Sequence, residues 1–229
     1  MLWHKGWLET RYRLLFALGF VGLFQVLQYK NVTTPQGIFA LVRFTVPVLV
    51  VMTYSLLAGA GIATQPSLVA SKGIHGSTLF TLSLPVSRFR LMSVRAAIGW
   101  LEGIGVIGVL CCALWLLSPA LRAMVGPGTM LQYAATLIAF GSAIYFVSVL
   151  LGTFLDDQWR TWGTMLTSGG LWWLSAHTAL PGFVDIFRGM GRGSPLITHT
   201  MPWNAILFSV LLAAVLFFAA LKVLRAREY

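Results

Sequence analysis

Six long apolar runs, separated by short polar or basic stretches, constrain this chain more than any other feature of its sequence. A membrane-spanning helix needs roughly 20 apolar residues, with a range of about 17–25. The chain is 58% hydrophobic and only 10% charged, whereas soluble domains carry about 25% charged residues. We therefore predict an all-α integral membrane protein with a single domain over residues 1–229. The six expected transmembrane helices are Leu14–Tyr29, Phe44–Ala63, Ala96–Leu117, Met130–Leu155, Thr161–Leu180 and Ala205–Leu221.

The distribution of lysine and arginine predicts the orientation of these helices, because cytoplasmic loops carry an excess of both residues. With a cytoplasmic N-terminus, eleven basic residues fall inside: Lys5, Arg11, Arg13, Lys72, Arg88, Arg90, Arg95, Arg160, Lys222, Arg225 and Arg227. Five fall outside: Lys30, Arg43, Arg122, Arg188 and Arg192. We therefore expect both termini in the cytoplasm. The net charge of +10 then reflects topology, and no nucleic-acid partner is expected.

The segment before the first run has a helical pattern of its own. Trp3 and Trp7 are four residues apart, and Lys5, Glu9 and Arg13 repeat at the same interval. On a helix these positions form an aromatic face and a charged face. The pattern predicts an interfacial helix over residues 1–13, lying in the membrane surface. The alternative is a basic flank that only orients the first span.

The longest outside connection, residues 181–204, contains short apolar pieces broken by glycines and prolines. These pieces are too short to span a membrane but long enough for re-entrant or interfacial elements. Its three alternating glycines, at positions 189, 191 and 193, lack the strand and helix context of a nucleotide-binding fingerprint. We interpret them as turn residues.

Motifs for catalysis and metal binding are missing from the sequence. None of the four lysines follows a glycine, as the phosphate-binding loop of an ATPase would require. The histidines at positions 4, 75, 177 and 199 are scattered, and the adjacent Cys111 and Cys112 have no metal-ligand spacing. Asp156 and Asp157 are neighbours on a turn and could bind a cation, but a solvated loop that caps the fifth span is the simpler interpretation. The chain is therefore not expected to be an enzyme or to bind a metal or cofactor itself.

One acidic residue, Glu102, falls inside a predicted span. It follows Arg95 by seven residues, about 10 Å along a helix, and so shares roughly the same face. A carboxylate in a span is costly and by default suggests a function with a partner. The alternative is a position close enough to the interface to pair with Arg95 or with the N-terminal helix. In both cases Glu102 should face protein rather than lipid.

Polar residues also follow a helical spacing in the fifth predicted span. Thr164, Ser168, Trp172 and Ser175 are separated by intervals of four, four and three residues. The second span has hydroxyl groups near its middle, at Tyr54 and Ser55. Two interpretations remain open: these residues line a substrate pathway, or they bond the preceding turn or a neighbouring helix.

The connection between the second and third runs is apolar, yet it is interrupted by Pro85 and followed by arginines. Residues 76–84 can form about two helical turns, and Ser87 is a suitable N-cap for a second helix that continues into the third span. The short helix carries no basic residue, so a protein groove is a better partner for it than anionic lipid.

The segment "KGIHGSTLFTLSLPVSRFRLMSVRAAIGWLE", Lys72 to Glu102, resembles the corresponding segment of type-2 ABC export permeases. These membrane subunits show Gly-Thr-Leu, then Leu-Pro-Val-Ser-Arg, then Arg-Ala entering the next span. The matching positions are Gly76, Thr78, Leu79, Leu84, Pro85, Val86, Ser87, Arg88, Arg95 and Ala96. The family has an acidic, charged run before the glycine, where this chain has "SKGIHG".

The resemblance implies a permease domain in a bacterial cytoplasmic (inner) membrane. Residues 76–84 would be a cytoplasmic coupling helix, seated in a groove of a separate ATPase subunit that uses ATP and Mg²⁺. A second permease copy, identical or paralogous, would complete the pathway, lined by Tyr54, Ser55, Thr164, Ser168 and Trp172. The residues expected to couple to the ATPase are Gly76, Thr78, Leu79, Phe80, Leu82, Leu84, Pro85, Ser87 and Arg88, with Arg95 and Glu102 inside the membrane.

Two other classes remain open. A secondary transporter or channel would need ionisable residues near mid-membrane and two matching halves; only Glu102 qualifies, and no internal repeat is visible. A non-transporting sensor with the permease fold would have the same sequence features.

Overall fold

The computed structural model describes residues 2–28, 34–58, 88–155, 157–178 and 180–226. All regular structure in these residues is helical. The elements are α1 (Leu2–Leu27), α3 (Pro35–Ala40), the π-helix η1 (Leu41–Thr45), α4 (Val46–Leu57), α6 (Arg88–Leu117), α7 (Pro119–Met124), α8 (Pro127–Leu151), α9 (Asp157–His177), α10 (Ile186–Met190), α11 (Pro195–Thr198) and α12 (Trp203–Ala226).

Five helical segments are long and apolar enough to cross a membrane: Thr10–Leu27, Pro35–Leu57, Met92–Leu117, Pro127–Leu151 and Trp203–Val223. They overlap five of the six predicted runs, so the all-helical character and the presence of membrane-spanning segments agree with the prediction. The remaining run forms α9, whose 21 residues extend about 31 Å. Its first turns carry Asp157, Arg160 and Thr164, which lower its hydropathy. A sixth span therefore stays a prediction.

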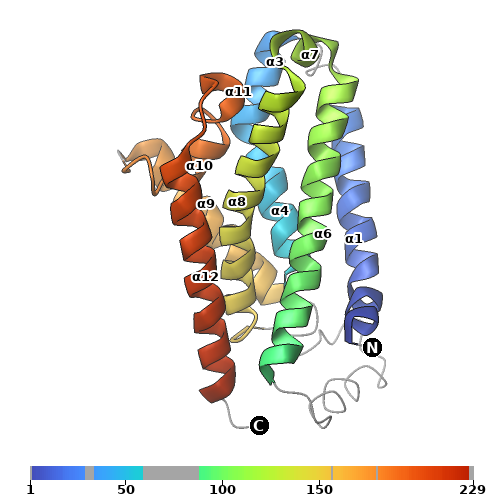
Figure 1. Ribbon diagram of the computed structural model, residues 1–229, viewed down its shortest axis with the longest axis vertical. Coiled ribbons are helices and arrows are strands. Elements are labelled where there is room, and N and C mark those ends of the chain that lie inside the picture. The colour runs from blue at the N-terminus through green and yellow to red at the C-terminus, as the bar shows by residue number, and fades with distance from the viewer. Residues whose placement is uncertain (1, 29–33, 59–87, 156, 179, 227–229) are drawn as a thin grey trace.

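The long helices pass alternately between two ends of the molecule (Figure 1). The start of α1 and the end of α12 lie at one end, which we call the N/C end. The short helices α3, α7 and α11 lie at the other, which we call the α7 end. Both described ends of the chain thus lie at the same end of the molecule. That this end is cytoplasmic stays a prediction.

Helix boundaries differ from the prediction in two places. α1 begins at Leu2 and is continuous to Leu27, so residues 2–13 do not form a separate helix before the first span. The second span begins at Pro35, ahead of the predicted Phe44, because the Thr34 hydroxyl caps α3 by accepting from Gly37 N at 3.2 Å. By contrast, α6 begins at Arg88 and continues to Leu117. This confirms the predicted helix that runs through the arginines into the third span.

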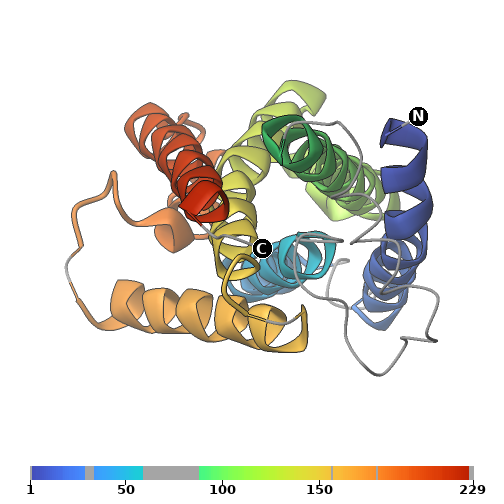
Figure 2. The ribbon, with the colours of Figure 1, turned by 90° about the horizontal axis from the view of Figure 1, so that it is seen from below.

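Helix α8 forms the centre of the bundle. It contacts α4, α6, α9, α10, α11 and α12, and 67% of its span is buried, against 22% for the spans of α1 and α12. Viewed from the N/C end, α1 and α12 lie at the edge, with α8 and α4 between them (Figure 2). The two edge helices expose large apolar side chains, which suits contact with lipid: Leu15, Phe16, Leu23, Leu211, Val215 and Phe218.

Close packing at the centre depends on glycine. The Tyr54 ring of α4 is fully buried between Gly103 of α6 and Gly141 of α8, and a methyl group added to either glycine would overlap the ring. Small residues of this kind let helices approach closely in membranes. The three helices α4, α6 and α8 therefore form one tightly packed unit around a single aromatic side chain.

Candidate functional site

Glu102 lies in the contact between α6 and α1. The Thr10 hydroxyl of α1 donates a hydrogen bond to Glu102 Oε1. Thr10 is 3% exposed and Glu102 is 9% exposed, so the carboxyl faces protein, as predicted. Of the partners considered from the sequence, Arg95 and the N-terminal helix, the structure supplies the N-terminal helix. Glu102 Oε2 is buried, and within the described residues it has no hydrogen-bond partner.

Two further polar contacts join α1 to the bundle. Arg13 Nη1 donates to the carbonyl oxygen of Leu56 in α4 at 3.4 Å. Gln25 Nε2 donates to the carbonyl oxygen of Leu110 in α6 at 3.3 Å. α1 also places Ala17 and Val21 in the apolar core, so hydrogen bonds and apolar packing together hold it against the bundle.

Several polar side chains lie close together at the centre of the bundle, near Glu102. Tyr145 of α8 packs edge-on against Tyr54, with ring centroids 6.0 Å apart, and its hydroxyl donates to the Ala96 carbonyl oxygen at 2.8 Å. Ser148, three residues after Tyr145 on α8, accepts a hydrogen bond from Arg160 of α9. Residues of α4, α6, α8 and α9 therefore meet in one interior polar region, which includes the predicted pathway residue Tyr54.

Arg160 is a charged residue of this region that the sequence analysis did not single out as a site residue. Its side chain is fully buried, and Nη1 donates to the Ser148 hydroxyl of α8 at 3.3 Å. In the sequence it was counted only as a basic residue that sets topology. The spacing contained a signal, since Arg160 precedes Thr164 by four residues and extends the predicted polar stripe by one turn.

The stripe itself lies inside the chain, facing α4 and α8. Thr164 and Ser168 are buried, and Trp172 is partly buried, with its ring 6.3 Å from that of Phe44. The Thr164 hydroxyl donates to the Arg160 carbonyl oxygen at 2.9 Å. On α4, the Ser55 hydroxyl likewise donates to the Met52 carbonyl oxygen at 3.0 Å. These two hydroxyl groups are bonded within their own helices, as the packing interpretation expects.

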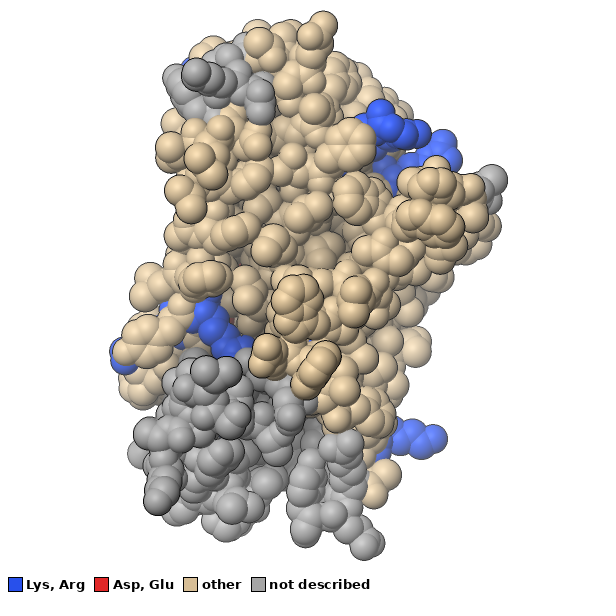
Figure 3. All heavy atoms as spheres, turned by 180° about the vertical axis from the view of Figure 1, so that it is seen from behind, with Lys and Arg blue, Asp and Glu red and all other residues tan. Residues whose placement is uncertain are grey.

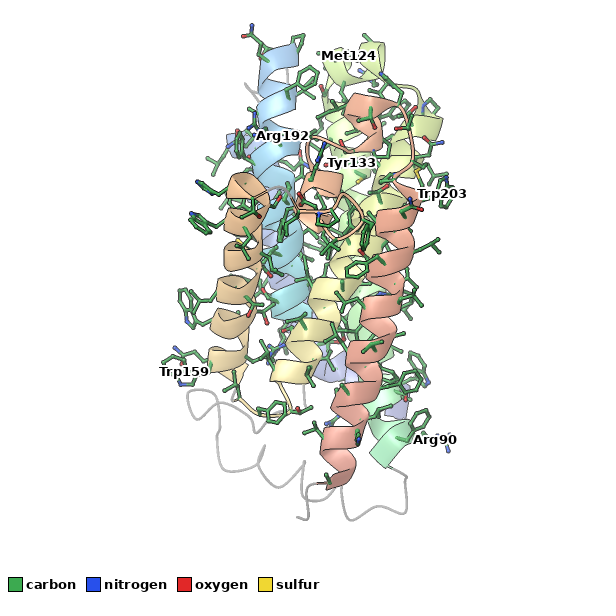
Figure 4. All side chains as sticks on the ribbon, turned by 90° about the vertical axis from the view of Figure 1, so that its left-hand side faces the viewer. Arg90, Met124, Tyr133, Trp159, Arg192 and Trp203 are labelled. Carbon is green, nitrogen blue, oxygen red and sulfur yellow. The ribbon has the colours of Figure 1, made fainter. Side chains whose placement is uncertain are left out.

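The opposite face of α9 is exposed and apolar. Figure 4 shows Trp159 pointing away from the bundle, and the same face carries Trp162, Leu166 and Trp173, all of them exposed. The structure therefore turns Thr164, Ser168 and Trp172 inward, at the contact between α4 and α9, which we call the α4–α9 seam. Trp159, Trp162 and Trp173 stay outside, and Tyr54 packs instead between α6 and α8.

The connection at residues 181–204 folds onto α8 through its two short helices. Asp185 caps α10, since its Oδ1 accepts from Arg188 N at 2.9 Å and from the Ser175 hydroxyl at 2.6 Å. A methyl group added to Gly189 would overlap the Phe140 ring. The glycines here permit close packing as well as turns.

The predicted ATPase-coupling residues lie almost entirely outside the described residues. This holds for Gly76, Thr78, Leu79, Phe80, Leu82, Leu84, Pro85 and Ser87, and the last of the set, Arg88, begins α6. Arg95, on the second turn of α6, is partly buried.

Across the part of the chain that the structure describes, no group of three or more His, Cys, Asp or Glu residues could hold a metal ion. In the comparisons with known proteins, no family model, curated protein or solved structure matches this chain.

Proposed function

We propose that this chain is the membrane-spanning permease subunit of an ABC transporter of the export type. It would form the substrate pathway as a dimer with a second permease copy, in a bacterial cytoplasmic membrane. ATP and Mg²⁺ would be used by a separate ATPase subunit, since the sequence contains no phosphate-binding loop. The observation that carries the proposal is the Lys72–Glu102 motif, which resembles the coupling segment of type-2 ABC permeases.

The position of α6 supports this reading, because the helix directly follows the motif's Pro-Val-Ser. From Arg88 to Leu117 it is continuous for 30 residues, about 45 Å. Glu102 lies 14 residues beyond Arg88, about 21 Å along the helix. A movement delivered to the start of α6 would therefore reach α1 through Thr10–Glu102, and α4 through the Gly103–Tyr54 contact.

The α4–α9 seam is the proposed substrate route, with Ser55, Thr164, Ser168 and Trp172 as its lining. Tyr54, the fifth predicted pathway residue, packs between α6 and α8. These side chains are buried or partly buried within one chain. Substrate would therefore reach them only when α9 separates from α4. Movement of α6 against Tyr54, which α4 contributes, offers a physical route to that separation.

Co-purification tests directly whether the chain is an ABC permease subunit. The tagged full chain, isolated from its native membrane in mild detergent, should bring with it a protein that has ATPase motifs. Burying a large apolar side chain is worth roughly 1.5–3 kcal/mol, so Phe80→Ala should weaken the association at least about tenfold. Ser77→Ala, on the polar side of the same predicted helix, is the matched control. Full ATPase binding and transport by both Phe80→Ala and Leu79→Ala would refute the docking assignment.

A secondary transporter driven by a proton gradient is the competing function, and the buried Glu102 is the observation that favours it. The two proposed functions differ in whether the purified chain moves protons without an ATPase subunit. In liposomes loaded with a pH-sensitive dye, the competing function predicts proton movement without ATP that Glu102→Gln abolishes. The permease proposal expects no such flux from the chain by itself.

A further inference from the structure

Three exposed arginines gather at the α7 end of the molecule, away from the interior polar region. They are Arg43 in η1, Arg188 in α10 and Arg192 in the turn after α10. Figure 4 places Arg192 close to the blue ribbon of α3–η1–α4. On the face drawn in Figure 3, lysine and arginine atoms gather at the upper right, and no acidic atom is visible on that face.

Backbone contacts hold these arginines in one place. A methyl group added to Gly191 would lie 3.2 Å from the Arg43 carbonyl oxygen and 3.4 Å from Arg43 Cα, so the two backbones touch. Gly193 N donates to the Arg188 carbonyl oxygen at 2.7 Å, which closes the turn that carries Arg192. We call Arg43, Arg188 and Arg192 the arginine cluster.

The acidic residue nearest in this loop does not lie at the surface beside them. Asp185 is buried, and its Oδ1 accepts from Arg188 N and from the Ser175 hydroxyl. That oxygen is used to cap α10 and to join α10 to α9. The outward face of the arginine cluster is therefore strongly positive.

Arg43 stands beside apolar and aromatic surface. It lies within the candidate span Pro35–Leu57, in a π-helical segment, and such segments are frequent at functional sites. Its guanidinium lies 4.8 Å from the centre of the Phe44 ring. Phe44 and Val48 are exposed and follow Arg43 along the same run of helix, so apolar surface continues from the arginine cluster toward the N/C end.

We propose that the arginine cluster binds the phosphate of an anionic lipid headgroup, with the acyl chains lying along Phe44 and Val48. Arginine pairs with phosphate through paired N–H donors, and long basic side chains reach from apolar surface into the headgroup layer. The adjoining apolar strip distinguishes a lipid from a free anion, because a soluble phosphate would gain nothing from it.

The test titrates short-chain phosphatidylglycerol into the purified full chain in neutral detergent and follows tryptophan fluorescence. Phosphatidylcholine of the same chain length and inorganic phosphate are the comparison probes. A basic residue near an anionic lipid surface contributes about a fivefold change in binding. R43Q, R188Q and R192Q should each weaken phosphatidylglycerol binding by about that factor, and the triple variant by about 100-fold.

R122Q is the matched control, because Arg122 is exposed on α7 at the same end but lies outside the arginine cluster. It should change binding less than twofold. Size-exclusion profiles check that each variant folds. If the triple variant misfolds, the single variant R192Q carries the test, because Arg192 is an exposed turn residue. Equal binding of phosphatidylglycerol and phosphatidylcholine, or equal loss in R122Q and the cluster variants, would overturn the proposal. Tight binding of inorganic phosphate alone would overturn the lipid assignment.

Discussion

Glu102 and Gly103 are neighbours in α6, and they make contacts of two different kinds. Gly103 has no side chain, which leaves room for the Tyr54 ring between α6 and α8. Glu102 instead presents a carboxyl group to the Thr10 hydroxyl of α1. The first contact depends on shape and the second on a hydrogen bond, and each joins α6 to a different helix.

The difference separates a fixed part of the bundle from a part that can respond. A close-packed interior resists small displacements because atoms overlap or lose contact at once. A hydrogen bond in low-dielectric surroundings is directional, and breaking it leaves a buried polar atom unsatisfied. We therefore expect α4, α6 and α8 to move together, and α1 to shift when the polarity of its contact changes.

We expect the largest loss of stability at the Tyr54 contact, where close packing joins α4, α6 and α8. Gly141→Ala places a methyl group against the Tyr54 ring, which Gly103 confines from the other side. Overpacking of this kind costs typically about 1–3 kcal/mol, and the confined ring points to the upper part of that range. Thermal unfolding in detergent, followed by tryptophan fluorescence, should show a clearly lower midpoint.

Gly105→Ala is the matched control for that change. Gly105 also lies in a long helix, but no atom is near the position of an added methyl group. Alanine favours helix over glycine by about 1 kcal/mol, so this variant should be as stable as the parent or slightly more stable. Equal midpoints for the two variants would mean that Tyr54 is not tightly enclosed.

A smaller effect is expected at the polar contact. Thr10→Val keeps the shape of the side chain but removes the donor to Glu102 Oε1, which leaves both carboxyl oxygens unpartnered at this buried position. An unsatisfied buried polar group costs about 1–3 kcal/mol. Detachment of α1 should appear as faster proteolysis near the N-terminus at a lower cost in unfolding midpoint than Gly141→Ala.

Thr167→Val controls for the loss of a threonine hydroxyl, because Thr167 is exposed and its hydroxyl donates to the Gly163 carbonyl oxygen of its own helix. It should leave proteolysis unchanged.

Glu102→Gln retains an oxygen that can accept from Thr10 and removes the carboxylate. If Glu102 couples α6 to α1, this variant should assemble normally but transport less per ATP hydrolysed. Parental coupling would remove Glu102 from the mechanism.

The two contacts also differ in how far the sequence could predict them. A carboxylate in an apolar run must find protein partners, so the burial of Glu102 followed from its position, and the N-terminal helix was one of two partners considered. The Tyr54 packing was not predicted, because Gly103 and Gly141 meet the ring from helices far apart in sequence. Pairing across such distances depends on tertiary geometry, which a single periodic pattern does not contain.

Arg160 is a second residue whose contacts the sequence did not predict. Its position before an apolar run suggested a charge at a membrane surface, yet it is buried against Ser148. The helical spacing from Thr164 to Trp172 marks a face of α9 that is buried or partly buried, and one more turn of the same spacing includes Arg160. The coupling function of residues 76–84 rests on the sequence resemblance alone, since those residues lie outside the described structure.

The smallest expected effect decides between the two interpretations of the α4–α9 seam. Ser168→Ala removes one buried hydroxyl and adds no volume, so stability should change by no more than about 1 kcal/mol. If the α4–α9 seam is a substrate route, the lost hydroxyl should change substrate-stimulated ATPase activity of the assembled complex at least about twofold. Thr167→Ala removes the adjacent exposed hydroxyl and should change neither quantity. Unchanged activity in Ser168→Ala, with parental stability, would show that this hydroxyl serves only to pack α9 against its neighbours.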